Sequence, residues 1–259
     1  MDPLRPERHA NESMFDRCPN EILLMFAAPL RNTPKTYTSA LAALARTSQR
    51  FRPVFEEELY KYNIRRQGSS VMAWAASKGL ISTMEKAVHF GAPIDSPVEF
   101  EVQIQHRPSD PSLTTARQVT APPLHYAVVS GEDDAVCWLL DREASLDSGS
   151  NDMCRCWFDD DLKMLPLHLS ICHERTSTAK ILLSRGAGLI LAYRPDDPKP
   201  PPIRDEYESH AWHFACYMGN VDLVRFLEDK YQGISHSRLR NNATALHAAA
   251  SAHGNTALG

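Results

Sequence analysis

A short motif ending in histidine occurs four times in this chain, each time at the start of an apolar segment with helical periodicity. The copies end at His125, His168, His213 and His247. Six residues after the first and third histidines the chain has glycine, and the other two copies have Glu174 and His253 there. A short helical unit of this kind cannot bury its apolar face alone and must stack on its neighbours. The repeat therefore predicts a helical solenoid that binds other molecules rather than an enzyme core.

The residues around these histidines carry a family resemblance. The first two copies read Pro-Pro-Leu-His125 and Leu-Pro-Leu-His168, and a weaker copy places Ala73 at the histidine position, followed by Trp74. The pattern resembles the ankyrin repeat, whose T-P-L-H-x-A signature opens the first of two antiparallel helices. The resemblance implies an all-α solenoid of about five units over residues 69–259, with units at 69–95, 121–147, 164–190, 209–235 and 243–259. It also implies that the motif histidines are structural residues at helix starts.

The spacing of the motifs is uneven. From Ala73 to His125 it is 52 residues, and the following intervals are 43, 45 and 34 residues, against a family period of about 33. The surplus lies where the ankyrin β-turn finger projects, so we expect long finger insertions. In the first, over about 93–121, β-prone residues alternate along the chain and predict a short hairpin arm: Val98, Phe100, Val102 and Ile104.

The second and third fingers combine acidic and aromatic residues. Insertions in a repeat array usually gather on one face, which is often the binding face. We therefore take a set of finger residues as a candidate surface for a protein target with a basic segment: Asp152, Trp157, Phe158, Asp159, Asp160, Asp161, Asp205, Glu206 and Tyr207. The alternative is that these loops are tolerated surface insertions, because long loops cost little free energy.

A separate helical module is predicted over residues 18–62, after a tail (1–17) that we expect to be disordered. Residues 18–23 read Cys-Pro-Asn-Glu-Ile-Leu, and a second helical pattern places Leu41 and Leu44 on one face. This succession resembles an F-box, with Cys18 where that family usually has leucine. The resemblance implies docking on the Skp-family adaptor of a cullin-RING ubiquitin ligase, through Pro19, Glu21, Ile22, Leu23, Met25, Leu30, Leu41 and Leu44. The order of the two modules is similar to that of fungal F-box/ankyrin proteins.

Two function classes remain beside a target-recruiting adaptor. In one, the F-box-like helices merely cap the array of a stand-alone ankyrin scaffold or regulatory binding protein. In the other, the fingers form a metal-dependent hydrolase, for which Cys154, Cys156, Cys172 and His173 are the only zinc-like set. No nucleophile elbow, phosphate-binding loop or metalloprotease motif is present, so we expect no enzyme, cofactor or metal.

The composition of the chain limits the kinds of partner and the cellular compartment that we expect. Residues 68–259 hold 17 Lys and Arg against 24 Asp and Glu, which argues against nucleic acid as the ligand of the array. No apolar run is long enough for a membrane span, and residues 1–18 lack the apolar core of a secretory signal. The six cysteines have no staple-like spacing, which is typical of a reducing cytoplasmic or nuclear location. We expect low order after about His253.

Overall fold

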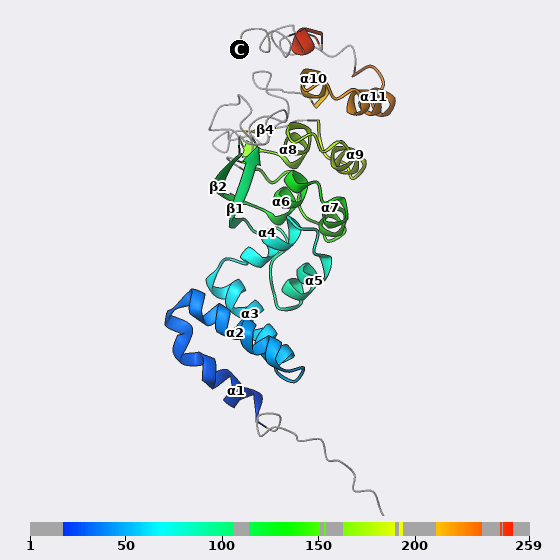
Figure 1. Cartoon of the computed structure of the whole chain (residues 1–259). Coiled ribbons are helices and arrows are strands. Elements are labelled where there is room, and N and C mark those ends of the chain that lie inside the picture. Colours follow the sequence, from blue (N-terminus) through cyan, green and yellow to red (C-terminus); the bar gives the residue numbers. More distant parts are fainter. Residues whose placement is uncertain are drawn as a thin grey trace, which may run out of the picture. The chain divides into compact units, whose positions relative to one another are not determined.

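The computed structural model describes residues 18–105, 114–150, 153, 163–189, 192–193, 211–234, 244 and 246–250. The chain divides into two compact units, Met1–Arg66 and Gln67–Gly259, and each is described by itself (Figure 1). The expected disordered tail at 1–17 and the expected loss of order after His253 both lie outside the described residues.

The first unit is a small helical module. It consists of α1 (Asn20–Ala27), the 3₁₀ helix η2 (Ala28–Asn32), α2 (Pro34–Thr47) and α3 (Phe51–Arg66). Pro34 occupies the first position of α2, where its missing N–H has no helical partner to lose. The backbone turns extended at Ser48, which ends α2. Helices α2 and α3 pack along each other, and α1 lies against both.

The second unit is a stack of helix pairs. The first helices of the pairs form one row and the second helices form another, because each helix packs on the equivalent helix of the next pair (Figure 1). This is the arrangement that the ankyrin resemblance predicts. The first row contains α4 (Ser70–Ala76), α6 (Pro123–Ser130), α8 (Pro166–Cys172) and α10 (Ala211–Tyr217). The second contains α5 (Ile81–His89), α7 (Asp133–Leu140), α9 (Thr176–Ser184) and α11 (Val221–Lys230).

The turn between the two helices of a pair needs a left-handed residue. Gly131 supplies it after α6 with a φ of 77°, and its N–H bonds the carbonyl of Ala127. In the next pair the same position is Glu174, with a φ of 58°. A side chain at this φ is strained, whereas glycine is not. The repeat geometry is therefore kept even where the sequence departs from its pattern.

Polar contacts connect successive helices of the second row. Thr178 Oγ1 donates to Asp133 Oδ1 at 2.5 Å, and Asn220 Nδ2 donates to Thr176 Oγ1 at 2.8 Å. Arg185 pairs with Asp141 at 2.6 Å. Each contact joins residues more than forty positions apart in sequence, so these contacts fix the register of one pair on the next.

The all-α expectation needs one correction, because the first finger is a long β-hairpin. Strand β1 (Val98–Gln105) pairs antiparallel with β2 (Thr114–Ala121) over eight residue pairs, from Val98 opposite Ala121 to Gln105 opposite Thr114. This confirms the hairpin expected from alternating β-prone residues. At the bases of the later fingers, the short strands β3 (Lys163–Met164) and β4 (Ala192–Tyr193) pair antiparallel.

Four helix pairs are complete within the described residues, and the fifth unit is described only in part. Residues 246–250 are helical, while 251–259 lie outside the described part. Leu246 is 80% exposed, whereas the equivalent Leu124 and Leu167 are buried.

Candidate functional site

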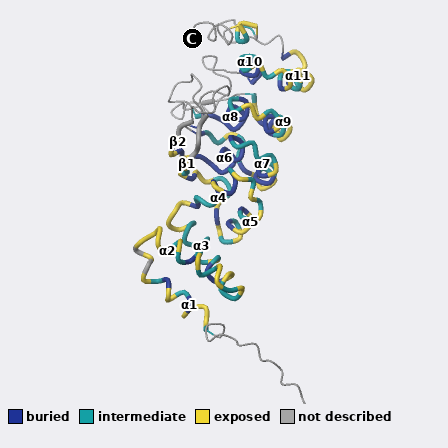
Figure 2. Tube along the Cα trace, in the orientation of Figure 1, coloured by how far each residue is buried: buried dark blue, intermediate teal, exposed yellow. Residues whose placement is uncertain are grey.

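The exposed side of α1 is the first candidate surface. Ile22, Met25 and Phe26 are 44%, 65% and 60% exposed. Their i, i+3, i+4 spacing places them on one face of the helix. Three large apolar side chains exposed on one face of a helix form a patch of the kind that partner proteins cover. Figure 2 shows that exposed positions recur along α1.

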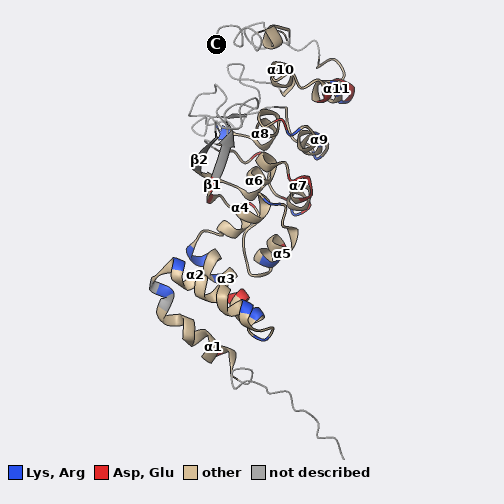
Figure 3. Cartoon of the chain, in the orientation of Figure 1, with Lys and Arg blue, Asp and Glu red and all other residues tan. Residues whose placement is uncertain are grey.

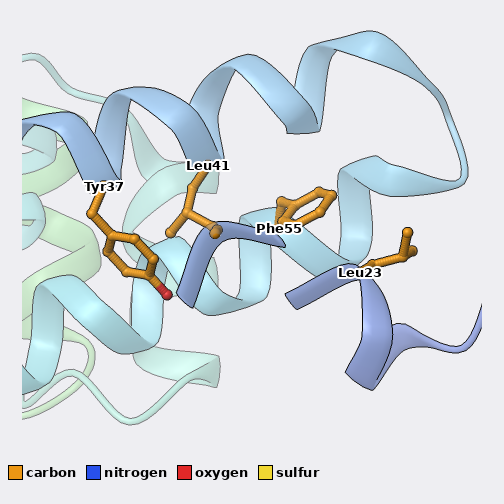
Figure 4. Close-up of a cluster of buried hydrophobic side chains, with 5 residues drawn as sticks. Leu23, Tyr37, Leu41 and Phe55 are labelled. Atoms are coloured by element: carbon orange, nitrogen blue, oxygen red, sulfur yellow. The ribbon is translucent and has the colours of Figure 1, made fainter. Parts of the chain in front are cut away.

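The opposite face of α1 forms the core of the module. Leu23 and Ala27 pack with Tyr37, Leu41 and Phe55, and all five are at most 1% exposed. Figure 4 shows that these side chains come from α1, α2 and α3, so one cluster holds the three helices together. Among the described residues of this unit, the only other buried residue is Val54, which is 7% exposed.

A polar contact closes one end of this core. The Tyr37 hydroxyl donates to Glu58 Oε1 at 2.8 Å and accepts from Arg31 Nε at 3.2 Å. Burial raises the pKa of the Tyr37 phenol, with Glu58 raising it further and Arg31 opposing. The hydroxyl therefore stays protonated and satisfied, and the large ring of Tyr37 is buried without an unpaired polar atom.

The predicted adaptor-contact residues separate into two groups in the structure. Pro19, Glu21, Ile22 and Met25 are exposed and Leu44 is half-buried; Leu30 lies in η2, and its side chain is not described. Leu23 and Leu41 are buried in the module core, so they hold the helices rather than offer a surface. Phe26 was not among the predicted contacts, although its spacing from Ile22 could have indicated it.

The motif histidines lie inside the array. His125 and His168 have no exposed surface and His213 is 3% exposed. Burial lowers the pKa of His125 to about 4, against the opposing effect of backbone groups of Ser148, Met164 and Pro122. Burial, helped by the nearby His173, lowers the pKa of His168 to about 3. Both imidazoles are neutral near pH 7, as expected of structural residues, and the ring of His168 stacks on Phe214 of the next pair at 4.8 Å.

The hairpin is the second candidate surface. Its base is held by Tyr126 of α6, which is fully buried and whose hydroxyl lies 2.6 Å from the carbonyl oxygen of Val98 and 2.7 Å from that of Val119. Phe100 packs edge-on against the Tyr126 ring at 5.7 Å. The hairpin carries exposed acidic residues, Glu99 and Glu101. Figure 3 shows further acidic residues of the same unit, for example on α7. The hairpin is therefore a fixed arm of the array.

The acidic-aromatic residues of the second and third fingers fall outside the described residues, so their role as a target surface stays a prediction: Asp152, Trp157, Phe158, Asp159, Asp160, Asp161, Asp205, Glu206 and Tyr207. The first finger was not among the predicted target-binding residues, and it is the one that the structure describes.

The zinc alternative has little support in the described region. Cys154 and Cys156 are not described, and Cys172 is disulfide-bonded, which removes its thiolate from any zinc set and differs from the expectation drawn from the cysteine spacing. His173 Nε2 lies 3.0 Å from the carbonyl oxygen of Met153. Over the described residues no group of three His, Cys, Asp or Glu side chains is arranged to hold a metal ion. In the same part of the chain, no helix combines the length and apolar character that crossing a membrane requires.

Comparisons with known proteins add one structural likeness. No family model matches the chain, and no curated protein matches it. Among solved structures, the crystal structure of the human ASB11 ankyrin repeat domain is similar to this chain, with 18% sequence identity and a TM-score of 0.45. The match covers 69% of this chain and 61% of that one, so this chain spans less than two thirds of the other.

Proposed function

We propose that this protein is a target-recruiting adaptor in which the exposed face of α1 docks on the Skp-family subunit of a cullin-RING ubiquitin ligase. The array would hold a protein target, and ubiquitin would be transferred by other subunits. The role requires no catalytic residue in this chain, because holding two molecules together is itself the contribution. The F-box resemblance of residues 18–62 motivates the choice of adaptor.

The single observation that carries the proposal is the exposure of Ile22, Met25 and Phe26 on one face of α1. Burying each such side chain in an interface contributes roughly 1.5–3 kcal/mol. The opposite face of α1 is already committed to the module core, so docking would leave the fold of the module unchanged. An interface with apolar anchors at its centre is typical of stable protein complexes.

The test is a double substitution on the docking face, Met25→Asp with Phe26→Asp, followed by co-purification with a Skp-family adaptor. Both side chains are exposed, so we expect a folded protein with unchanged circular dichroism that no longer binds the adaptor. Leu23 is unsuitable for this purpose, because a charge there would disrupt the module core.

A matched control adds the same two charges elsewhere, at Ser82→Asp and Ser177→Asp on exposed positions of α5 and α9. This control should bind the adaptor as the unaltered protein does. Failure of the unaltered chain to bind the adaptor on a sizing column would overturn the proposal and favour the stand-alone scaffold. Adaptor binding that survives the α1 double substitution would also contradict it.

A further inference from the structure

The contacts of Tyr126 show which residues of the hairpin direct their backbone groups between the strands and which direct them outward. One hydroxyl reaches the carbonyl oxygens of both Val98 and Val119, so both carbonyls point into the space between the two strands. Val98 is opposite Ala121 and Phe100 is opposite Val119. The groups of these four residues therefore point between the two strands.

In an antiparallel pair the residues alternate, so the neighbours of these residues point their backbone groups the other way. On β1 these neighbours include Glu99 and Glu101, whose N–H and C=O groups face away from β2. Among the residues that the structure describes, no backbone group from outside the hairpin bonds to either strand. The outer edge of β1 is therefore a row of hydrogen-bonding groups with no backbone partner among the described residues, on a strand that also packs against α4.

The negative charge on this edge limits which strands can pair with it. Glu99 and Glu101 are exposed, lie on the same face of β1, and are opposite the uncharged Thr120 and Gln118 on β2. Paired residues of adjacent strands project their side chains to the same face, where opposite charges attract and like charges repel. A second copy of β1 would place glutamate beside glutamate, whereas a strand with lysine or arginine at alternate positions would match both.

We propose that the outer edge of β1 binds an extended basic segment of a partner protein, which adds to the hairpin as an antiparallel strand. This inference rests on the proposed function, in which the array holds a protein target, and it names how the target is held. Main-chain hydrogen bonds would supply the affinity, and Glu99 and Glu101 would select basic side chains. Because Tyr126 fixes the base of the hairpin, the edge is ordered before the partner arrives, which lowers the entropic cost of binding.

The probe is a fluorescent ten-residue peptide of alternating lysine and threonine with blocked ends, titrated against the full chain. In antiparallel pairing the residues opposite Glu99 and Glu101 direct their own amides toward β1, so the lysine amides make the hydrogen bonds. N-methylation of the lysine amides should weaken binding about tenfold or more, since several hydrogen bonds are lost together. N-methylation of the threonine amides keeps the same charge and composition and should leave binding within about twofold.

Variants of the protein test the same edge from the other side. Glu101→Pro removes one outward N–H without removing a bond to β2, as edge strands tolerate, and should weaken binding about tenfold. Gln118→Pro makes the matched change on the outer edge of β2 and should bind as the unaltered chain does. The charge reversal Glu99→Lys with Glu101→Lys should also abolish binding. Circular dichroism and the unfolding midpoint establish that each variant is folded.

Three results would overturn the inference: no binding of the unmethylated peptide, equal binding of the two methylated peptides, or loss of binding in Gln118→Pro but not in Glu101→Pro. The methylated peptides use the unaltered protein, so the test stands even if a proline variant unfolds. Adaptor co-purification is measured on the same preparations. Peptide failure with intact adaptor binding rejects only the strand addition, and adaptor failure with intact peptide binding rejects only the docking role of α1.

Discussion

The two units of this chain are stabilised in different ways. The helical module depends on one cluster of five buried residues contributed by α1, α2 and α3. In the array, each helix pair packs on its neighbours, and polar contacts such as Thr178 to Asp133 join pairs distant in sequence. A single core therefore makes the module all-or-none, whereas the array spreads its stability over several interfaces. A core substitution should therefore unfold the whole module, whereas a substitution of the same size in the array should destabilise mainly the helix pairs around it.

The largest effect is expected from Phe55→Ala in the module. Phe55 is 1% exposed and central to the cluster, so its truncation should cost about 3–5 kcal/mol and unfold the module. Amide exchange should show loss of protection over residues 18–66 while α6 to α9 stay protected. Equal loss of protection in the array would show that the two units do not unfold independently.

Acid should destabilise the array and leave the module largely unaffected. His125 and His168 have folded-state pKa values near 4 and 3, while an unfolded histidine titrates near 6.5. Below pH 6.5 the unfolded array thus binds more protons than the folded one, and its stability falls as the pH decreases. Between pH 7.5 and 5.5 the loss should be roughly 2–3 kcal/mol for the two groups together.

Residues 18–66 contain no histidine, so the module does not share this loss. Denaturant unfolding at the two pH values, followed separately by exchange in each unit, measures the difference. If both units lose the same stability between these pH values, the buried histidines are not the cause.

A smaller and more local effect is expected from Tyr126→Phe. The substitution keeps the buried ring and removes the hydroxyl between the carbonyls of Val98 and Val119, at a cost of about 1–2 kcal/mol. Exchange should quicken in β1 and β2 while the helices keep their protection. Unchanged amide exchange in β1 and β2 would mean that the hydrogen bonds between the two strands hold the hairpin without Tyr126.

The smallest expected effect is a gain in the stability of the array. Glu174→Gly relieves a side chain held at a φ of 58° and should stabilise the array by about 0.5–1 kcal/mol. The matched change in the preceding pair, Gly131→Ala, should destabilise it, because φ is 77° there and an added Cβ would lie 2.8 Å from Arg175 Cδ. Thermal unfolding midpoints measure both. A loss of stability in Glu174→Gly would indicate that the glutamate makes a compensating contact.

The sequence predicts the repeated features of this fold better than its unique ones. The stacked helix pairs and the hairpin follow from spacing and alternation, which recur or extend over many residues, whereas the burial of the motif histidines is seen only in the structure. The face of α1 that packs inward does not follow, because Leu23 with Ala27 and Ile22 with Met25 and Phe26 are both apolar sets at helical spacing. Only the positions of Tyr37, Leu41 and Phe55 decide between them.

The contact of the Tyr126 hydroxyl with the two strands of the hairpin could not be predicted from the sequence either. Tyr126 directly follows a motif histidine, where an ankyrin pattern gives no reason to expect a hydroxyl joining two strands. The two carbonyls that it reaches, of Val98 and Val119, lie 28 and seven residues before it. Contacts of this kind depend on how a finger folds back on its helix, which no local pattern encodes.

The exposure of Met25 has a consequence for oxidative chemistry. Its thioether is open to solvent, whereas Met72, Met84 and Met153 are fully buried. Peroxide oxidises accessible methionines first and turns a flexible apolar side chain into a polar sulfoxide. The α1 face would thus lose apolar character under oxidative stress before these buried methionines react. Sulfoxide reductases could reverse the change, so the same residue that offers an apolar anchor also makes that anchor responsive to the redox state of its surroundings.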